Sequence, residues 1–316
     1  MTKESKSLIP ASIILAGFVL ALAVFFKGGH VSTTTLYKKE NKIREKTETT
    51  ADGLGIVADS FQLPVDWGDL GARLISAGVI DADKFSEIYG GKDNLTAEET
   101  NLLFGENNGK LKITKDNAGF VLNLFWALGL ANKNPILDSG EMANPRYGGA
   151  QNFASTGGWT VADGNVTGHY SRHKFFNLSS EEQALVEKIS AGIYRPCCDN
   201  STHFPDCNHG MAMLGLLELM ASQGVSEQNM WSVALAVNSY WFPDNYQIIS
   251  IYMKNKGIKW ESVNPQEILG INYSSASGYA KIASQVTLPN SSQGWGSCSV
   301  SVAEPSFVAK IKQNNC

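Results

Sequence analysis

The apolar run from Ser7 to Phe26 constrains this chain more than any other feature, because it carries no charged residue over its whole length. A helix of that length spans the hydrocarbon core of a bilayer, so the sequence predicts a transmembrane segment over 7–26. Lysines flank the run on both sides and therefore do not fix its orientation. We favour an uncleaved anchor over a cleaved signal peptide, because the small-residue pair Ala21 and Ala23 lies inside the run.

The rest of the chain divides by composition. A single amino-terminal anchor followed by a large domain usually places that domain outside the cytoplasm, so we expect a membrane-anchored, extracytoplasmic protein. A polar stretch rich in Thr, Lys and Glu follows the anchor and has the composition of a solvated linker. The predicted segments are an amino-terminal tail (1–6), the anchor or signal (7–26), the linker (27–59), a helical domain (60–290) and a Gly/Ser-containing tail (291–316).

Composition limits the function classes that remain. With 316 residues and 43% hydrophobic content, the chain is long and apolar enough to bury a core, so disorder throughout is excluded. The net charge of −4 argues against a nucleic-acid-binding surface, which normally requires a basic patch. The sequence contains no phosphate-binding G-x-x-x-x-G-K-[ST] loop and no G-x-S-x-G nucleophile turn. It does not identify protein partners.

Helix-start signals recur through the soluble part and predict a mainly α fold. Capping boxes begin at Thr96 and Ser179, and Asn264 precedes a proline at a first helical position. A further amphipathic helix is expected from Asp66 to about Ala77. The run 120–130 is too short to span a membrane and is expected to form a buried core helix.

Strand signals are rare, and one long segment has no periodicity. Period-2 alternation is limited to Gly109–Thr114 and Gln285–Leu288, which are the two predicted strands. Residues 138–168 are rich in Gly, Asn and Ser and predict a long irregular loop inside the helical domain. Loops of that length are often functional, although a plain surface connection between helices is the alternative.

Cysteine and histidine cluster just before the apolar run 211–220, and this cluster is the candidate site. Turn residues fill the space between its cysteines, so the chain is expected to fold back there as a loop that leads into a helix. Thiolates and imidazoles form a ligand set that both copper and zinc favour. The candidate metal ligands in this segment are Cys197, Cys198, Cys207, His209 and His203.

Two other uses of the cluster remain open. The spacing is not that of paired zinc knuckles, so the signal is the residue type and density alone. Outside the cytoplasm the cysteines can pair as a disulfide, for example Cys198 with Cys207, which would staple a helical interaction module. A metal- or thiol-dependent enzyme is the third use. Cys298 is a possible further ligand or disulfide partner, and the terminal Cys316 has no assigned role.

A second pair of histidines extends the candidate ligand set. His169 and His173 stand four residues apart, and in a helix both rings would lie on one face. The intervening residues do not contain the glutamate of an H-E-x-x-H zinc protease motif. We therefore include both histidines as possible ligands, with ordinary surface histidines as the alternative.

Several segments resemble an uncharacterised family of prokaryotic membrane-anchored or exported proteins. The most distinctive is R-P-C-C followed by F-P-D-C-N-H-G-M-A-M, from Arg195 to Met213. The resemblance covers roughly residues 60–300 and implies a shared fold without implying an activity. The other segments that carry it are Trp67–Gly71, Trp126–Asn134, Tyr147–Trp159, His169–His173 and Asn238–Asp244.

Overall fold

A computed structural model describes residues 56–287. The predicted anchor over 7–26, nearly all of the predicted linker, and the tail with Cys298 and Cys316 lie outside the described residues. Within residues 56–287, no helix is both long enough and apolar enough to cross a membrane.

The described chain is mainly helical, as predicted, with one small two-stranded sheet. The strands are β1 (Ser60–Gly68) and β2 (Asn108–Thr114). The α-helices are α3 (Leu70–Ser76), α4 (Ala82–Glu87), α5 (Ala97–Phe104), α6 (Ala118–Ala131), α7 (Pro135–Ser139), α8 (Ala154–Gly157), α9 (Ser180–Gly192), α10 (Asn208–Ser222), α11 (Glu227–Trp241), α12 (Pro243–Asn255), α13 (Pro265–Leu269), α14 (Ile271–Ser274) and α15 (Ala276–Ala283). Short 3₁₀ turns are η1 (Lys92–Asn94), η2 (Glu141–Ala143), η3 (Pro145–Tyr147), η4 (Ala150–Asn152), η5 (Val166–Gly168) and η6 (Trp260–Ser262).

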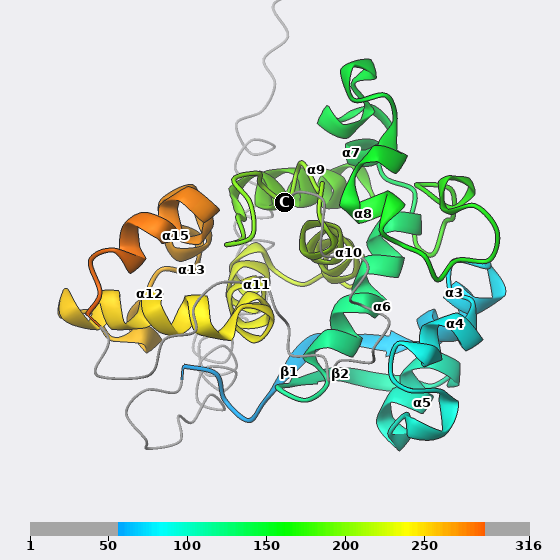
Figure 1. Cartoon of the computed structure of the whole chain (residues 1–316), viewed down its shortest axis with the longest axis horizontal. Coiled ribbons are helices and arrows are strands. Elements are labelled where there is room, and N and C mark those ends of the chain that lie inside the picture. The colour runs from blue at the N-terminus through cyan, green and yellow to red at the C-terminus, as the bar shows by residue number, and fades with distance from the viewer. Residues whose placement is uncertain (1–55, 288–316) are drawn as a thin grey trace, which may run out of the picture. The chain divides into compact units, whose positions relative to one another are not determined.

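Helix α10 is the centre of this domain. Every residue from 209 to 221 is buried, so the helix has no solvent-facing side over that length. It contacts α6, α8, α9, α11 and β1, and Figure 1 shows it along its axis with α6, α9 and α11 around it. A helix that is covered on all sides holds its first turn in a fixed position, and the candidate site lies at that end.

Helices α6 and α10 pack backbone to backbone through two glycines. A Cβ placed on Gly129 would lie 2.1 Å from the carbonyl oxygen of Met211, and one on Gly215 would lie 2.5 Å from that of Phe125. Any larger residue would therefore force the helices apart. The predicted core helix over 120–130 is α6, and the structure confirms that it is buried.

The sheet confirms one predicted strand and corrects two other expectations. Strand β2 covers the predicted Gly109–Thr114, but Gln285–Thr287 forms a turn and irregular chain. The helix expected from Asp66 is wrong at its start, because β1 continues to Gly68. Leu63, Val65 and Trp67 alternate inward along β1, and Pro64 between them obscures that period-2 pattern in the sequence.

Local capping chemistry places the other helices where the sequence predicts them. Thr96 and Ser179 form complete capping boxes with Glu99 and Glu182, and Asn264 caps α13 through its side chain. The segment 138–168 is a chain of short turns and one-turn helices rather than open loop. Its glycines and asparagines serve those turns, as at η3, where Asn144 caps the start.

A carboxyl group is buried at the middle of α10. Glu218 has no exposed surface and accepts hydrogen bonds from the side chains of Asn132 and Asn134. Gln183 on α9 continues this polar network by bonding to Asn134. Burial raises the pKa of Glu218 well above its ordinary value of 4.5, although the two amide bonds oppose the shift.

Replacing Glu218 with glutamine should remove the pH dependence that this buried carboxyl gives to the stability of the fold. A raised folded-state pKa means that the carboxyl stabilises the fold below about pH 4.5 and that this stabilisation is lost as the pH rises towards the folded-state pKa. The difference in free energy of unfolding between Glu218→Gln and the wild type should shift in favour of the variant as the pH rises from 4 to 7, because only the wild type has a carboxyl that must stay protonated in the fold. Urea unfolding at both pH values tests this, with the exposed Glu181→Gln as control. The same change with pH in the wild type and in Glu218→Gln would show that burial does not raise the pKa of Glu218.

Candidate metal centre

The candidate site is a loop between α9 and α10 that backbone hydrogen bonds hold at both ends. The Thr202 N–H donates to the carbonyl of Ile193 at 2.8 Å, which closes the loop on itself. The Cys198 carbonyl accepts from the Ala276 N–H at 3.0 Å, at the start of α15. The positions of the cysteines are therefore set by the surrounding helices rather than by the loop sequence alone.

Arg195 organises the loop from inside. Its side chain is 1% exposed, and its guanidinium donates to the carbonyls of Asn200 at 2.9 Å and Phe204 at 3.2 Å. It also donates to the carboxylate of Asp206 at 2.6 Å and, through Nε, to the sulfur of Cys207 at 3.0 Å. Gly210 makes room for this group, because a Cβ there would lie 2.6 Å from the Arg195 Cζ.

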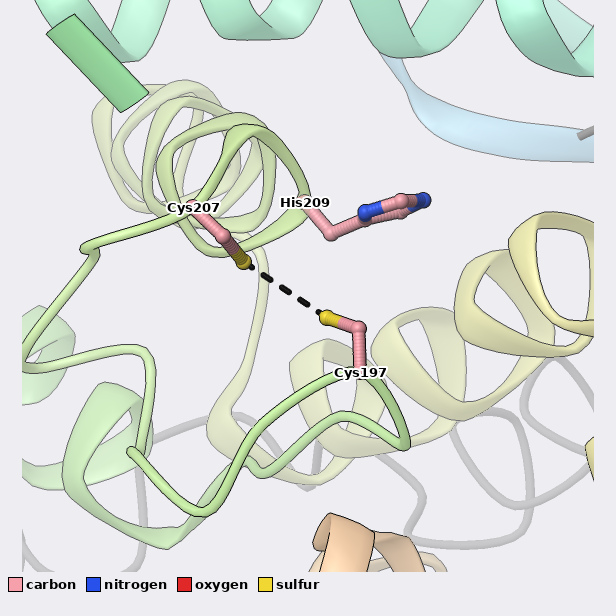
Figure 2. Close-up of side chains that lie close together, drawn as sticks. All are labelled: Cys197, Cys207 and His209. Carbon is pink, nitrogen blue, oxygen red and sulfur yellow. Dashed lines mark hydrogen bonds between the residues drawn. The ribbon is translucent and has the colours of Figure 1, made fainter. Parts of the chain in front are cut away.

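Cys197, Cys207 and His209 bring their ligand atoms within 4.8 Å of one another (Figure 2). The two sulfurs are 3.6 Å apart. Two thiolates bound tetrahedrally to one zinc ion, at about 2.3 Å each, are separated by about 3.8 Å. Cys197, Cys198 and Cys207 are free cysteines in the structure, and a separation of 3.6 Å suits both a hydrogen bond between two thiols and two ligands of one ion.

His209 lies in the first turn of α10 and is almost completely buried, with 8% of its surface exposed. Its ring packs against Phe242 at 4.3 Å and Trp241 at 6.2 Å between ring centroids. Its Nε2 has no hydrogen-bond partner among the described residues. A buried imidazole beside two thiols can offer a ring nitrogen to a metal ion, and a hydrogen bond from His209 already reaches the sulfur of Cys207.

A second group, made of Cys198, Asp206 and Cys207, is less suited to a metal ion. Its ligand atoms also lie within 4.8 Å of one another. Both oxygens of Asp206 are already used, because one accepts from Arg195 and the other from the Asn200 amide at 2.8 Å. An ion here would have to compete with a buried guanidinium for the carboxylate. The first group, made of Cys197, Cys207 and His209, is therefore the better candidate, and Cys198 lies close enough to add a ligand to it.

Cys207 is the cysteine of this cluster whose surroundings most favour the negatively charged thiolate. Hydrogen bonds from Cys197 and Cys198, with help from Arg195 and His209, hold the pKa of Cys207 well below its usual range against the effect of burial. The pKa of Cys197 is raised, because its thiol hydrogen bonds with the other two sulfurs favour the protonated form and burial adds to them. Of the three cysteines, Cys207 is the one whose surroundings favour the thiolate, and its sulfur is also the N-cap that accepts from the Gly210 N–H.

Arg195 remains a cation in this environment. Burial alone would lower its pKa, but the sulfurs of Cys207, Cys198 and Cys197 more than offset that effect and raise it. A permanent positive charge thus lies against the ligand sulfurs. Such a charge stabilises thiolates whether or not an ion is bound.

The remaining candidate histidines are placed outside both ligand groups. The backbone N–H of His203 donates to Ser190, at the end of α9. His169 and His173 are not helical but form a pair of their own, with Nδ1 of one 3.0 Å from Nε2 of the other. The outer nitrogen of His169 bonds to the Asp163 carbonyl at 2.9 Å, so this pair is tied into the irregular segment.

Arg195 and Asp206 are not among the ligands predicted from the sequence. Nothing in the composition of the loop distinguishes a buried arginine from a solvated one. The sequence feature that could have identified Arg195 is its position two residues before the adjacent cysteines Cys197 and Cys198. Gly210 faces its guanidinium in the structure.

Comparison with known proteins returns no match, since no family model, curated protein or solved structure is similar to this chain.

Proposed function

We propose that this protein binds a soft transition metal ion, copper or zinc, through Cys197, Cys207 and His209. The observation that carries the proposal is the grouping of two sulfurs, 3.6 Å apart, with a buried imidazole whose ligand nitrogen lies within 4.8 Å of both. The site is positioned by the first turn of a fully buried helix, so its three ligands come together without the ion. The affinity for the ion distinguishes two roles. A tightly bound ion would be structural, and a weakly bound ion would be passed on.

Arg195 supports the proposal through charge and hydrogen bonding. A divalent ion with two or three thiolates has a net charge of zero or −1, and an adjacent guanidinium favours such a centre. The N–H···S bond from Arg195 to Cys207 leaves other lone pairs of that sulfur available to a metal. The residue would act as an outer partner that holds and orients a ligand.

Cys198 is the natural fourth ligand for zinc. Its sulfur now faces the Asn200 carbonyl and the Asp206 carboxylate, each at 3.9 Å. Rotation of this side chain would bring a third thiolate to the ion and close a tetrahedral site, as structural zinc requires. Copper(I) is also compatible with a soft set of two sulfurs and one imidazole.

Cellular location forms part of the proposal. We infer an amino-terminal membrane anchor at 7–26 with the metal centre outside the cytoplasm, from the length of that apolar run. We also retain the proposed kinship with the prokaryotic membrane-anchored or exported family, on the motif that contains the ligands.

Metal content of the purified protein tests the proposal. Reduced protein expressed with zinc and copper available should contain about one equivalent of one of these metals, because the ligands are preassembled. Binding should strengthen as the pH rises, since the raised pKa of Cys197 means that this thiol must release a proton to coordinate. Elemental analysis and titrations at two pH values measure both. Less than about half an equivalent of any transition metal would refute the proposal.

A further inference from the structure

The sulfurs of Cys197 and Cys207 are close enough to bond to each other. They are 3.6 Å apart, whereas a disulfide is about 2.05 Å long, so they need to approach by about 1.5 Å. The backbone on either side is fixed, because Cys207 caps α10 and the Cys198 N–H bonds to the Arg195 carbonyl at 3.2 Å. Rotation of the two side chains therefore has to supply the movement.

The donors around Cys207 suit it to be the attacking sulfur. Nε of Arg195 donates to it at 3.0 Å, and the Gly210 N–H faces it at 3.5 Å. The sulfur also sits at the amino end of α10, a helix of 15 residues whose dipole favours negative charge there. A thiolate held this way is the form that attacks disulfides.

Cys197 is the better placed of the two adjacent cysteines to complete the reaction. The Cys197 sulfur faces that of Cys207 directly, as Figure 2 shows. The Cys198 sulfur lies within 4.8 Å of that of Cys207, but it also contacts two oxygen acceptors, the Asn200 carbonyl and the Asp206 carboxylate, each at 3.9 Å. Pairing with Cys198 would break both contacts, which distinguishes the two adjacent cysteines.

We propose that Cys207 and Cys197 form a redox-active dithiol that exchanges with small disulfides. The Cys207 thiolate attacks one sulfur of the small disulfide, whose S–S bond breaks and releases one small thiolate. That thiolate takes the proton of the Cys197 thiol. The Cys197 thiolate then attacks the Cys207 sulfur of the mixed disulfide and expels the second small thiolate. The two protein sulfurs lose two electrons in total, and the small disulfide gains them.

Oxidation and metal binding exclude each other at this site, a consequence that rests on the proposed metal function. The disulfide removes both sulfur ligands of the first group at once, so the oxidised protein should lose metal affinity. A bound ion should in turn protect the pair from oxidation. The dithiol reaction itself needs no metal and is tested without one.

Disulfide mapping of metal-free protein tests the pairing. The reduced full chain is treated with chelator and then with oxidised glutathione, and the remaining thiols are alkylated. Cleavage before aspartate cuts at Asp199 and Asp206 and so separates the fragment that carries Cys197 and Cys198 from the fragment that carries Cys207. We expect these fragments to stay joined until reductant is added, with the alkyl group on Cys198 by tandem mass spectrometry.

Two cysteine variants test independently which cysteine pairs with Cys207. Cys198→Ser should retain the cross-link, whereas Cys197→Ser should stop at the glutathione mixed disulfide on Cys207. Separate fragments in the wild type, an alkyl group on Cys197, or links to Cys298 or Cys316 instead would each overturn the proposal. Metal content is measured on reduced protein without oxidant, so failure of the dithiol leaves the metal result intact, and the reverse also holds.

Discussion

Arg195→Met should lower the free energy of unfolding by about 3 kcal/mol and disorganise the cysteine loop. The substitution keeps much of the side chain's volume but removes every hydrogen bond of a guanidinium that is 1% exposed. The carbonyls of Asn200 and Phe204 and the carboxylate of Asp206 would lose their donor. Buried acceptors without partners lower the free energy of unfolding. The loss is smaller for Asp206, because 21% of its side chain is exposed to water.

Chemical denaturation measures this effect, with Arg172→Met as the matched control. Arg172 is an exposed arginine in a turn between η5 and α9, so its replacement should change the free energy of unfolding by less than about 0.5 kcal/mol. The pH at which the alkylation of Cys207 by iodoacetamide reaches half its maximal rate should also rise, because the thiolate loses its cation. Arg195→Met with wild-type stability and wild-type alkylation would contradict the role assigned to Arg195.

Cys207→Ser should weaken metal binding by more than about 100-fold while the fold survives. Loss of an outer partner of a metal ligand already costs about 10–100-fold, and Cys207 is proposed as a direct ligand shared by both groups. Serine is a favourable N-cap, so its hydroxyl can still accept from the Gly210 N–H and preserve the start of α10. The variant thus separates ligand loss from unfolding.

Competition titrations against a chelator of known affinity, with circular dichroism as the folding check, measure the change. Cys198→Ser should have a smaller effect than Cys207→Ser, and His169→Ala should have none, because His169 lies outside both ligand groups. Metal affinity in Cys207→Ser equal to that of the wild type would remove this residue from the site. An equal loss in His169→Ala would place the ion elsewhere.

Local sequence chemistry predicts much of the fold. Capping boxes at Thr96 and Ser179 fix two helix starts, and the apolar run 120–130 identifies the buried core helix. Strand β1 was missed because its alternation includes Pro64 and its partner strand lies about 50 residues further along the chain. Pairing over such distances is decided by packing against α6 and α10, which no local pattern contains.

The candidate site was predictable in residue type but not in arrangement. Three cysteines and a histidine before an apolar run are visible in the sequence, and the structure brings Cys197, Cys207 and His209 together. The hydrogen-bonding role of Arg195 is not visible, since a charged residue is ordinarily expected at the surface. Nor does spacing alone decide between Cys197 and Cys198 as the partner of Cys207, because adjacent residues differ only in the direction of their side chains.

X-ray absorption at the metal edge of the reduced, metal-loaded protein tests directly whether Cys197, Cys207 and His209 bind the ion. It counts the atoms bound to the ion and reports their distances. For zinc, we predict two or three sulfurs at about 2.3 Å from the ion and one imidazole nitrogen at about 2.0–2.1 Å. The sulfur count should fall by one in Cys207→Ser, if enough ion remains bound. A first shell made only of oxygen and nitrogen would contradict a metal centre built on Cys197, Cys207 and His209.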